Sequence, residues 1–204
     1  YTYWLYDYAG VNPQNGNALW RNEEGLLTEN YGEARRINAG SPEPLWTGGF
    51  NTELSWKGIS LGIQLEARYG NKVLNQDRSL FEADGSYGDQ NIWKGAMNYW
   101  KKPGDTNVLP KPVYNNSSNS SAISTRYLED GSYLRIKDIT LAYNLPSKWT
   151  KKALMSGVRI YASALNLYTF HNMNYWDPEH GTTGATIISY PMTRSMIVGV
   201  DITF

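Results

Sequence analysis

Strict alternation of apolar and polar side chains is the feature that most constrains the fold of this chain. In residues 58–69 every second side chain is apolar, and the set is Ile59, Leu61, Ile63, Leu65, Ala67 and Tyr69. The intervening side chains are polar or small: Ser60, Gly62, Gln64, Glu66 and Arg68. Because a period of two places alternate residues on opposite faces of a β-strand, this stretch predicts a strand with one apolar face.

The same period predicts strands at approximately 48–57, 58–70, 132–145, 157–170 and 193–204, with a tight hairpin at Lys57-Gly58. Residues 1–9 are predicted as a sixth strand, although their aromatic side chains occupy both faces. In residues 132–145 the alternation slips by one position between Ile136 and Ile139. One extra residue near Lys137-Asp138 would restore the phase, which predicts a β-bulge with Leu134 and Ile139 on the same face.

The connections between these strands alternate between short and very long. Residues 10–47, 71–131 and 171–192 are rich in Gly, Pro, Asn and Ser and are predicted as loops. Such long loops are unusual in a compact soluble domain, whereas outer-membrane barrels combine short turns with long external loops. We therefore predict an all-β chain that forms an antiparallel transmembrane β-barrel segment with long extracellular loops. An antiparallel sandwich with one polar face would alternate in the same way.

The amino-acid composition excludes some classes of function and favours others. The chain has 19 basic and 19 acidic side chains, so it lacks the basic surplus typical of nucleic-acid binding, and no nucleic-acid partner is predicted. It has no cysteine, which excludes disulfides and thiolate chemistry. The aromatic side chains are 16 Tyr, 8 Trp and 4 Phe, a bias typical of membrane interfaces and of sugar-binding surfaces. The chain begins without Met, which predicts a fragment or a processed product.

Signals of catalysis or of metal binding are weak. Gly58-Ile-Ser-Leu-Gly62 matches G-x-S-x-G, but Ser60 lies inside the best alternating strand and not at the sharp turn that a nucleophile elbow requires. Asp177, Glu179 and His180 are close enough in sequence to hold a metal, although ligands on such a Pro-containing turn are usually solvated. We predict no catalytic residue, no metal site and no cofactor. We therefore predict that the protein is not an enzyme.

A series of motifs resembles one known family. Residues 8–16 are similar to its Ala-Gly-Val-Asp-Pro-x-Thr-Gly loop, with Asn12 in place of Asp and Asn15 in place of Thr. Residues 126–146 form the longest continuous match. Shorter matches follow the same order along the chain, at residues 40–44, 48–52, 56–58, 100–105, 166–170, 177–179, 190–191 and 199–204. As an ordered set, these motifs resemble the C-terminal part of a SusC/RagA-type TonB-dependent outer-membrane transporter of Gram-negative bacteria.

The resemblance implies the last six strands of a 22-stranded barrel whose lumen is plugged by an N-terminal domain. It implies active import of large nutrients, which are oligosaccharides and in some cases peptides, as the channel subunit of a SusCD-type complex. The implied partners are a SusD-like surface lipoprotein that acts as a lid, TonB-ExbB-ExbD acting through the missing N-terminal part, the remaining barrel and plug, and outer-membrane lipid.

Candidate site residues follow from this placement. Aromatic side chains in the external loops are expected to contact cargo or the lid, or else to pack within the loops: Trp93, Tyr99, Trp100, Tyr114, Tyr127, Tyr175 and Trp176. The polar faces of the strands are expected to face the lumen through Glu53, Gln64, Glu66, Arg68, Arg135 and Arg159. The lipid-facing set is Ile59, Leu61, Ile63, Leu65, Val198, Val200 and Ile202. Phe204 resembles the terminal aromatic residue that the insertion machinery recognises, and is the predicted assembly signal.

Two other function classes fit the same composition. A secreted β-sandwich carbohydrate-binding module would also be rich in Trp and Tyr, and a β-rich glycoside hydrolase fragment would need a pair of carboxylates. Extraction separates them, because an outer-membrane barrel stays in the detergent fraction whereas a module dissolves in buffer. A hydrolase would turn over substrate.

Overall fold

The computed structural model describes residues 1–88, 91–114, 118–179, 185–186, 190 and 192–204. The chain divides into two compact units. Unit 1 comprises Tyr1–Glu43, Lys72–Asp130 and His180–Ser189, and unit 2 comprises Pro44–Asn71, Gly131–Glu179 and Tyr190–Phe204. The chain passes back and forth between them, so neither unit is a continuous stretch of sequence.

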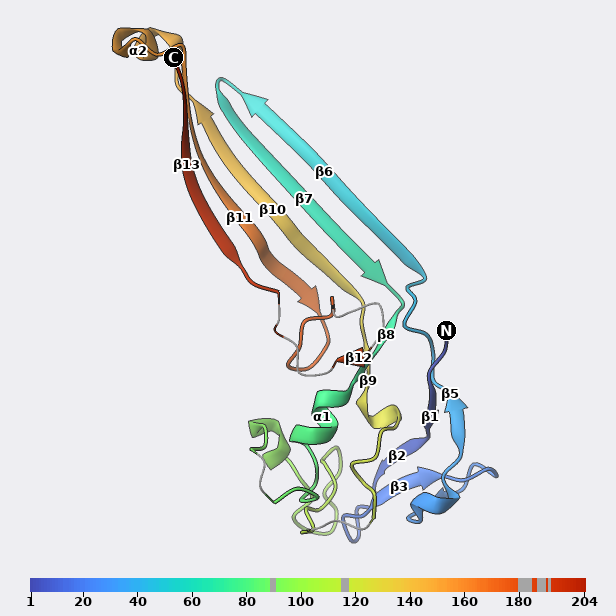
Figure 1. The fold of residues 1–204 in the computed structure, drawn as a ribbon. Helices are drawn as coiled ribbons and strands as arrows, with labels where there is room; N and C mark the ends of the chain where they lie inside the picture. The colour runs from blue at the N-terminus through green and yellow to red at the C-terminus, as the bar shows by residue number, and fades with distance from the viewer. Residues whose placement is uncertain (89–90, 115–117, 180–184, 187–189, 191) are drawn as a thin grey trace. The chain divides into compact units, whose positions relative to one another are not determined.

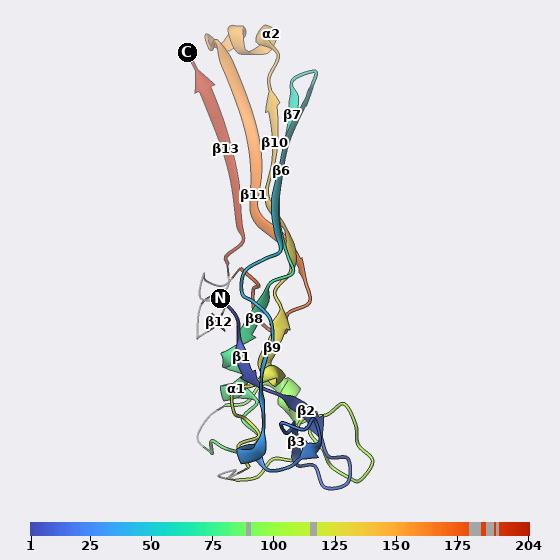
Figure 2. The ribbon, with the colours of Figure 1, turned by 90° about the vertical axis from the view of Figure 1, so that its right-hand side faces the viewer.

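Unit 2 is one antiparallel sheet of five long strands. The strands are β6 (Trp46–Trp56), β7 (Ile59–Tyr69), β10 (Tyr133–Asn144), β11 (Gly157–His171) and β13 (Ser195–Thr203). Their order in the sheet is β13-β11-β10-β7-β6 (Figure 1). Seen from the side, the sheet is a single curved layer (Figure 2). Two short helices, α2 (Ser147–Thr150) and η4 (Lys151–Ala153), connect β10 to β11.

The expected strands at 48–57, 58–70, 132–145, 157–170 and 193–204 overlap these five observed strands. The hairpin between β6 and β7 turns at Lys57 and Gly58, whose φ angles of 48° and 88° are left-handed. The predicted bulge is confirmed, because the pairing of β10 with both neighbours shifts between Ile136 and Asp138. Lys137 is the one extra residue opposite β7, whereas on the β11 side Asn166 and Leu167 also fall out of the register.

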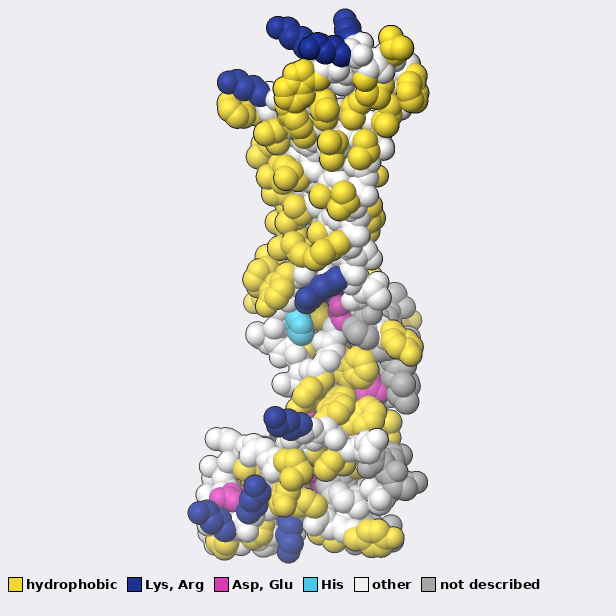
Figure 3. All heavy atoms as spheres, turned by 90° about the vertical axis from the view of Figure 1, so that its left-hand side faces the viewer, with side chains coloured by type: hydrophobic (Ala, Val, Ile, Leu, Met, Phe, Trp, Pro, Cys, Tyr) yellow, Lys and Arg dark blue, Asp and Glu magenta, His cyan; other side chains and the backbone are white. Residues whose placement is uncertain are grey.

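The register sorts the side chains of unit 2 onto two faces. Leu134 pairs with Ala67 before the bulge, and Ile139 pairs with Ile63 after it, so both lie on the face that carries the apolar residues of β7. Directly opposed residues of antiparallel strands point to the same side. That face is widely exposed, and Figure 3 shows hydrophobic side chains along the length of the sheet. A soluble sandwich would need a second sheet packed on this face. In the described part of unit 2, Leu54, Trp56 and Val198 are instead more than half exposed there.

Unit 1 is built from short strands in three small sheets. One sheet pairs β1 (Trp4–Tyr6) with β5 (Arg36–Asn38), and another joins β2 (Tyr8–Val11), β3 (Ala18–Arg21) and β4 (Leu27–Thr28). The third joins β12 (Ala185–Thr186), β8 (Lys72–Asn75) and β9 (Leu128–Asp130). Its helices are α1 (Gln76–Phe81), η1 (Tyr31–Glu33), η2 (Lys94–Met97) and η3 (Thr125–Tyr127). Among the described residues, no helix has both the length and the apolar character needed to cross a membrane.

Two expectations are wrong in unit 1. Residues 1–9 do not form a sixth long strand: β1 pairs with β5 and β2 pairs with β3, and the change of partner falls at Asp7, which accepts a hydrogen bond from Arg35 at 2.8 Å. The expected loops 10–47 and 71–131 are largely folded. The core of unit 1 contains Leu5, Leu74 and Tyr127, and Trp20 is also fully buried.

Glu29 stabilises the loop of residues 12–17 in a pH-dependent way. Its carboxylate accepts hydrogen bonds from the side-chain amides of Asn17, Asn15 and Asn12, at 2.7, 2.8 and 2.6 Å, and these bonds lower its pKa. A lowered pKa stabilises the folded loop above the unfolded pKa of about 4.3, and the effect is lost as the pH falls through the folded value.

We therefore expect amide exchange in residues 12–17, measured by hydrogen–deuterium exchange corrected for intrinsic rates, to rise as the pH falls below about 4. Glu29→Gln should abolish this dependence, whereas Glu23→Gln should preserve it. The same pH dependence in the Glu29→Gln variant would show that another group controls the loop.

Candidate functional site

A cluster of charged side chains on the polar face of unit 2 centres on Arg135. Arg135 lies opposite Glu66 on β7 and Thr169 on β11, and its side chain is fully buried. Its guanidinium donates to Glu179 at 2.6 Å and also binds Asp177. Because a buried guanidinium requires compensation, these two carboxylates hold residues 177–179 against the sheet.

The bulge at Lys137 completes this cluster. Lys137 Nζ lies 3.0 Å from a Glu179 oxygen and 3.1 Å from a Glu66 oxygen, so one ammonium joins a strand carboxylate to a loop carboxylate. The Tyr133 hydroxyl donates to Glu66 at 2.7 Å. The phase slip in the sequence predicted the bulge but not this role of Lys137. Asp177 and Glu179 drew attention as metal-ligand candidates, whereas the structure engages both in ion pairs.

Beside this cluster the polar face has a pocket of about 450 Å³. The residues that give it chemical character are Arg135, Asn166, His171, Tyr175, Trp176 and Arg194. Tyr175 and Trp176 precede Asp177 directly, so the ion pairs of Asp177 and Glu179 fix the segment that carries both rings. The pocket combines cationic, amide and aromatic groups, which suits a ligand with polar atoms and a flat or apolar part.

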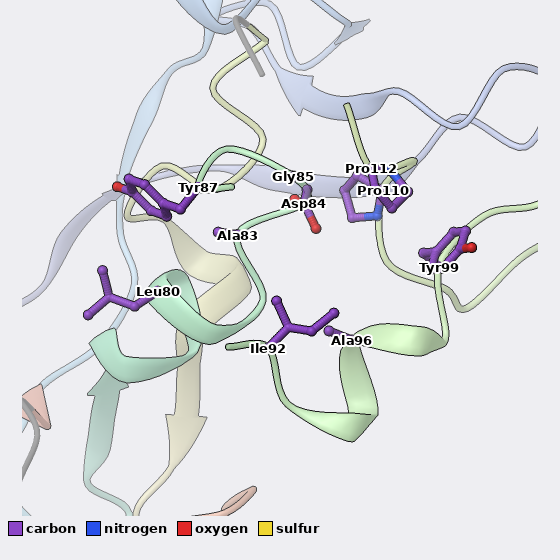
Figure 4. Close-up of a pocket in the computed structure, with 10 residues that line it drawn as sticks. All are labelled: Leu80, Ala83, Asp84, Gly85, Tyr87, Ile92, Ala96, Tyr99, Pro110 and Pro112. Carbon is purple, nitrogen blue, oxygen red and sulfur yellow. The ribbon is translucent and has the colours of Figure 1, made fainter. Parts of the chain in front are cut away.

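A second pocket, of about 220 Å³, lies within unit 1 (Figure 4). Its wall is mostly apolar and includes Leu80, Ile92, Pro110 and the predicted candidate Tyr99. Asp84 also lines this pocket, but its carboxylate forms a buried ion pair with Arg126.

The environment of that ion pair explains two shifted pKa values. Burial alone would lower the pKa of Arg126, but the hydrogen bonds to Asp84 outweigh it and the pKa is raised. Burial raises the pKa of Tyr8, whose ring lies 5.7 Å from the Arg126 guanidinium, to about 12. Arg126 and Asp84 thus form a buried, hydrogen-bonded ion pair inside unit 1.

The other predicted aromatic residues separate into packed and exposed ones. Trp93 stacks on Phe81 at 4.9 Å, and Trp100 donates its indole hydrogen to the Pro13 carbonyl at 3.0 Å, so each ring packs within unit 1. Tyr114 is 85% exposed. Of the alternatives expected for Tyr127, the structure supports packing within the loops, because its side chain is fully buried in the core of unit 1.

The strand register places the residues predicted to face the lumen on one face of the sheet and those predicted to face lipid on the other. Glu53, Gln64, Glu66, Arg68, Arg135 and Arg159 pair with one another or with residues of the polar face. The opposite face carries Ile59, Leu61, Ile63, Leu65, Val198, Val200 and Ile202. Phe204 follows β13 and is 88% exposed, and its assembly role stays a prediction.

The motifs considered for chemistry are used structurally. Ser60 lies within β7 and shares a hydrogen bond of 2.9 Å with Ser55 on the neighbouring strand, so it does not have the geometry of a nucleophile elbow. His180 lies outside the described residues. In the described part of the chain, no group of three or more His, Asp or Glu side chains is arranged to hold a metal ion.

Comparison with known proteins identifies the class. No family model matches the chain. It is 31% identical over 182 residues to TonB-dependent receptor P3 of Formosa agariphila, an alignment that covers 84% of this chain and 17% of the receptor. It is 28% identical over 203 residues to TonB-dependent receptor P26 of the same organism, covering 93% of this chain and 20% of that receptor. The chain thus spans about a fifth of the length of these relatives.

Solved structures give the same result for the fold. The whole chain superposes on 23% of a chain in a structure of the RagAB peptide transporter, with a TM-score of 0.83 and 29% identity. The "closed-closed" state of the RagAB peptide importer matches with the same TM-score and 30% identity. The fold class is therefore a segment of a TonB-dependent β-barrel. The two comparisons are consistent with a SusC/RagA-type fragment of a TonB-dependent protein from the outer membrane of Gram-negative bacteria.

Proposed function

We propose that this chain forms part of the wall and the external loops of an outer-membrane channel that imports large nutrients with energy supplied through TonB. The observation that carries the proposal is the sorting of unit 2 into an exposed apolar face and a polar face with a structured pocket. In this account the apolar set meets lipid and the polar set faces the lumen. The pocket of Tyr175, Trp176 and Arg194 contacts cargo, and the chain performs no catalytic step.

The cargo is an oligosaccharide or a peptide. The RagAB structures support the peptide class, because they are described as a peptide transporter and importer. The pocket supports both classes, since aromatic rings stack on sugars and on apolar side chains, while Arg194 and His171 can donate to carboxylates or hydroxyls.

The proposed assembly has several partners. A SusD-like surface lipoprotein closes over the external side, and the exposed ring of Tyr114 is the candidate from the predicted set that contacts it. TonB-ExbB-ExbD acts through a part of the transporter outside this chain, and the remaining barrel and plug surround the polar face. The partner assignment rests on the relationship to the TonB-dependent receptors and to RagAB.

Uptake by the full-length transporter tests the proposal. Cells carrying Trp176→Ala or Tyr175→Ala should need about tenfold more labelled cargo for half-maximal uptake, because truncating a central aromatic contact typically costs more than 1 kcal/mol. Trp4→Ala, at an exposed position of β1 in unit 1, is the matched control and should behave as the parent. Labelled peptides and labelled oligosaccharides are compared in parallel. The import function would be contradicted if the cells took up neither the peptides nor the oligosaccharides in an energy-dependent way. If both aromatic variants took up cargo as the parent does, the pocket would not lie on the path of the cargo.

A further inference from the structure

Basic side chains gather at the end of the unit 2 sheet where its connections are shortest. Lys57 lies in the hairpin between β6 and β7, Lys148 lies in α2, and Lys151 and Lys152 lie in η4; all four are exposed. The hairpin and the two helices lie at the same rim of the sheet, because the backbone amide of Asn144, at the end of β10, donates to the backbone carbonyl of Gly58 at 2.8 Å. Figure 3 shows Lys and Arg side chains at this end, next to the apolar face.

The charge of this rim is not neutralised locally. Among the described residues, no salt bridge involves Lys57, Lys148, Lys151 or Lys152. Lys57 instead lies over the ring of Trp56, with its ammonium 4.6 Å from the ring centroid. Asp201 lies two residues from the end of β13 and pairs with Arg159 at 3.4 Å. The rim therefore attracts an anion that the described part of the chain does not supply.

The same rim exposes apolar side chains on an ordered turn. Trp149 is 62% and Leu154 is 89% exposed, directly beside the lysines. The turn is fixed by backbone hydrogen bonds from Met155 to Thr150 at 3.1 Å and from Ser156 to Thr203 at 2.7 Å. A basic segment with exposed Trp and Leu is typical of protein that lies in the interface of a membrane, with apolar side chains in the acyl region and ammonium groups at the phosphates.

A groove of about 550 Å³ runs along the apolar face next to this rim, and Lys57 is part of its wall. The register explains the groove: Ala162 lies between Leu141 on β10 and Val198 on β13, so a methyl group stands where its neighbours present larger side chains. Tyr143 and Ile160, which pair with each other, extend the lining toward the rim. An apolar chain suits a groove lined by side chains of β7, β10, β11 and β13.

We propose that this rim and groove bind an anionic phospholipid, with an acyl chain in the groove beside Ala162 and the phosphate group at the lysines. Short turns of outer-membrane barrels face the periplasm, so the rim meets the inner leaflet, which consists of glycerophospholipids. The positive charge of the lysines suits a phosphate group, and the groove continues into the apolar face, so a lipid with an anionic headgroup is the occupant that fits both. This lipid site goes beyond nutrient import and does not depend on the identity of the cargo.

Native mass spectrometry of the full-length transporter, titrated in detergent with phosphatidylglycerol or phosphatidylcholine, tests the proposal. Phosphatidylglycerol should be retained in preference. Combined Lys148→Gln, Lys151→Gln and Lys152→Gln should lower its apparent affinity by about tenfold or more, because each lysine near an anionic surface adds about a fivefold preference. The control combines Lys101→Gln and Lys102→Gln in unit 1. It makes the same kind of substitution away from the rim and should leave the apparent affinity for phosphatidylglycerol unchanged.

The groove has its own matched pair of variants. Ala162→Phe fills the groove and should reduce binding of both lipids, whereas Ala164→Phe, two residues further along the same face, should not. Equal retention of the two lipids, or equal losses in the rim and unit 1 lysine variants, would overturn the proposal. Binding of lipopolysaccharide in place of phosphatidylglycerol would also overturn it, since that lipid belongs to the outer leaflet.

Discussion

Arg135→Ala is expected to destabilise, by about 3 kcal/mol, the end of the sheet at which Arg135 binds Asp177 and Glu179, and to release residues 172–179 from it. Removing one partner of a buried ion pair costs about 3–5 kcal/mol, because the opposite charge remains without compensation. The lower end of this range applies because the side chains of Asp177 and Glu179 are 13% and 19% exposed, so water can partly hydrate their carboxylates. Urea unfolding in lipid vesicles measures the loss, and limited proteolysis reports the release of the loop.

The control for Arg135→Ala is Arg194→Ala, which removes a cationic side chain from the same pocket but breaks no ion pair within the described residues. Its effect should be small. Adding Asp177→Asn and Glu179→Gln to Arg135→Ala should recover part of the stability, since neutral amides leave no unpaired charge. If Arg135→Ala and Arg194→Ala unfold alike and are cleaved alike, the cluster does not hold the loop.

Ile63→Arg is expected to cost about 2–4 kcal/mol of barrel stability, because an arginine on the lipid face near the bilayer midplane loses its hydration. Ile63 pairs with Thr52 and with Ile139, so it lies near the middle of the sheet. Gln64→Arg places the same side chain one residue along the strand, on the polar face, and should cost less than about 1 kcal/mol. Folding of the full-length transporter into vesicles, titrated with urea, compares them. Equal costs would contradict the assignment of the two faces.

The sheet of unit 2 was predictable because its signal is local. Each strand has to keep one apolar face along its whole length, so even the extra residue at Lys137 is visible as a shift in the alternation. The partners of Lys137 and Arg135 were not visible, because Arg135 and Asp177 are 42 positions apart and any of several carboxylates could have been the partner.

Unit 1 could not be predicted in the same way. Its strands have only two to four residues, too few to establish a period, and some pair across long stretches of sequence, such as β8 with β12. The buried Tyr127 and the exposed Tyr114 are both tyrosines in polar segments, so composition does not separate a core residue from a surface residue. Their positions depend on tertiary packing, which a local pattern does not contain.

The central claim is that the apolar face of unit 2 meets lipid while the polar face meets water. Spin labels attached to single cysteines at positions 60 to 66 of the full-length transporter, reconstituted in vesicles, test it most directly. Accessibility to oxygen, which concentrates in the bilayer, should peak at Leu61→Cys, Ile63→Cys and Leu65→Cys. Accessibility to a water-soluble nickel chelate should peak at the four alternate positions, Ser60→Cys, Gly62→Cys, Gln64→Cys and Glu66→Cys. Profiles without a period of two, or with the two probes peaking at the same positions, would contradict the account.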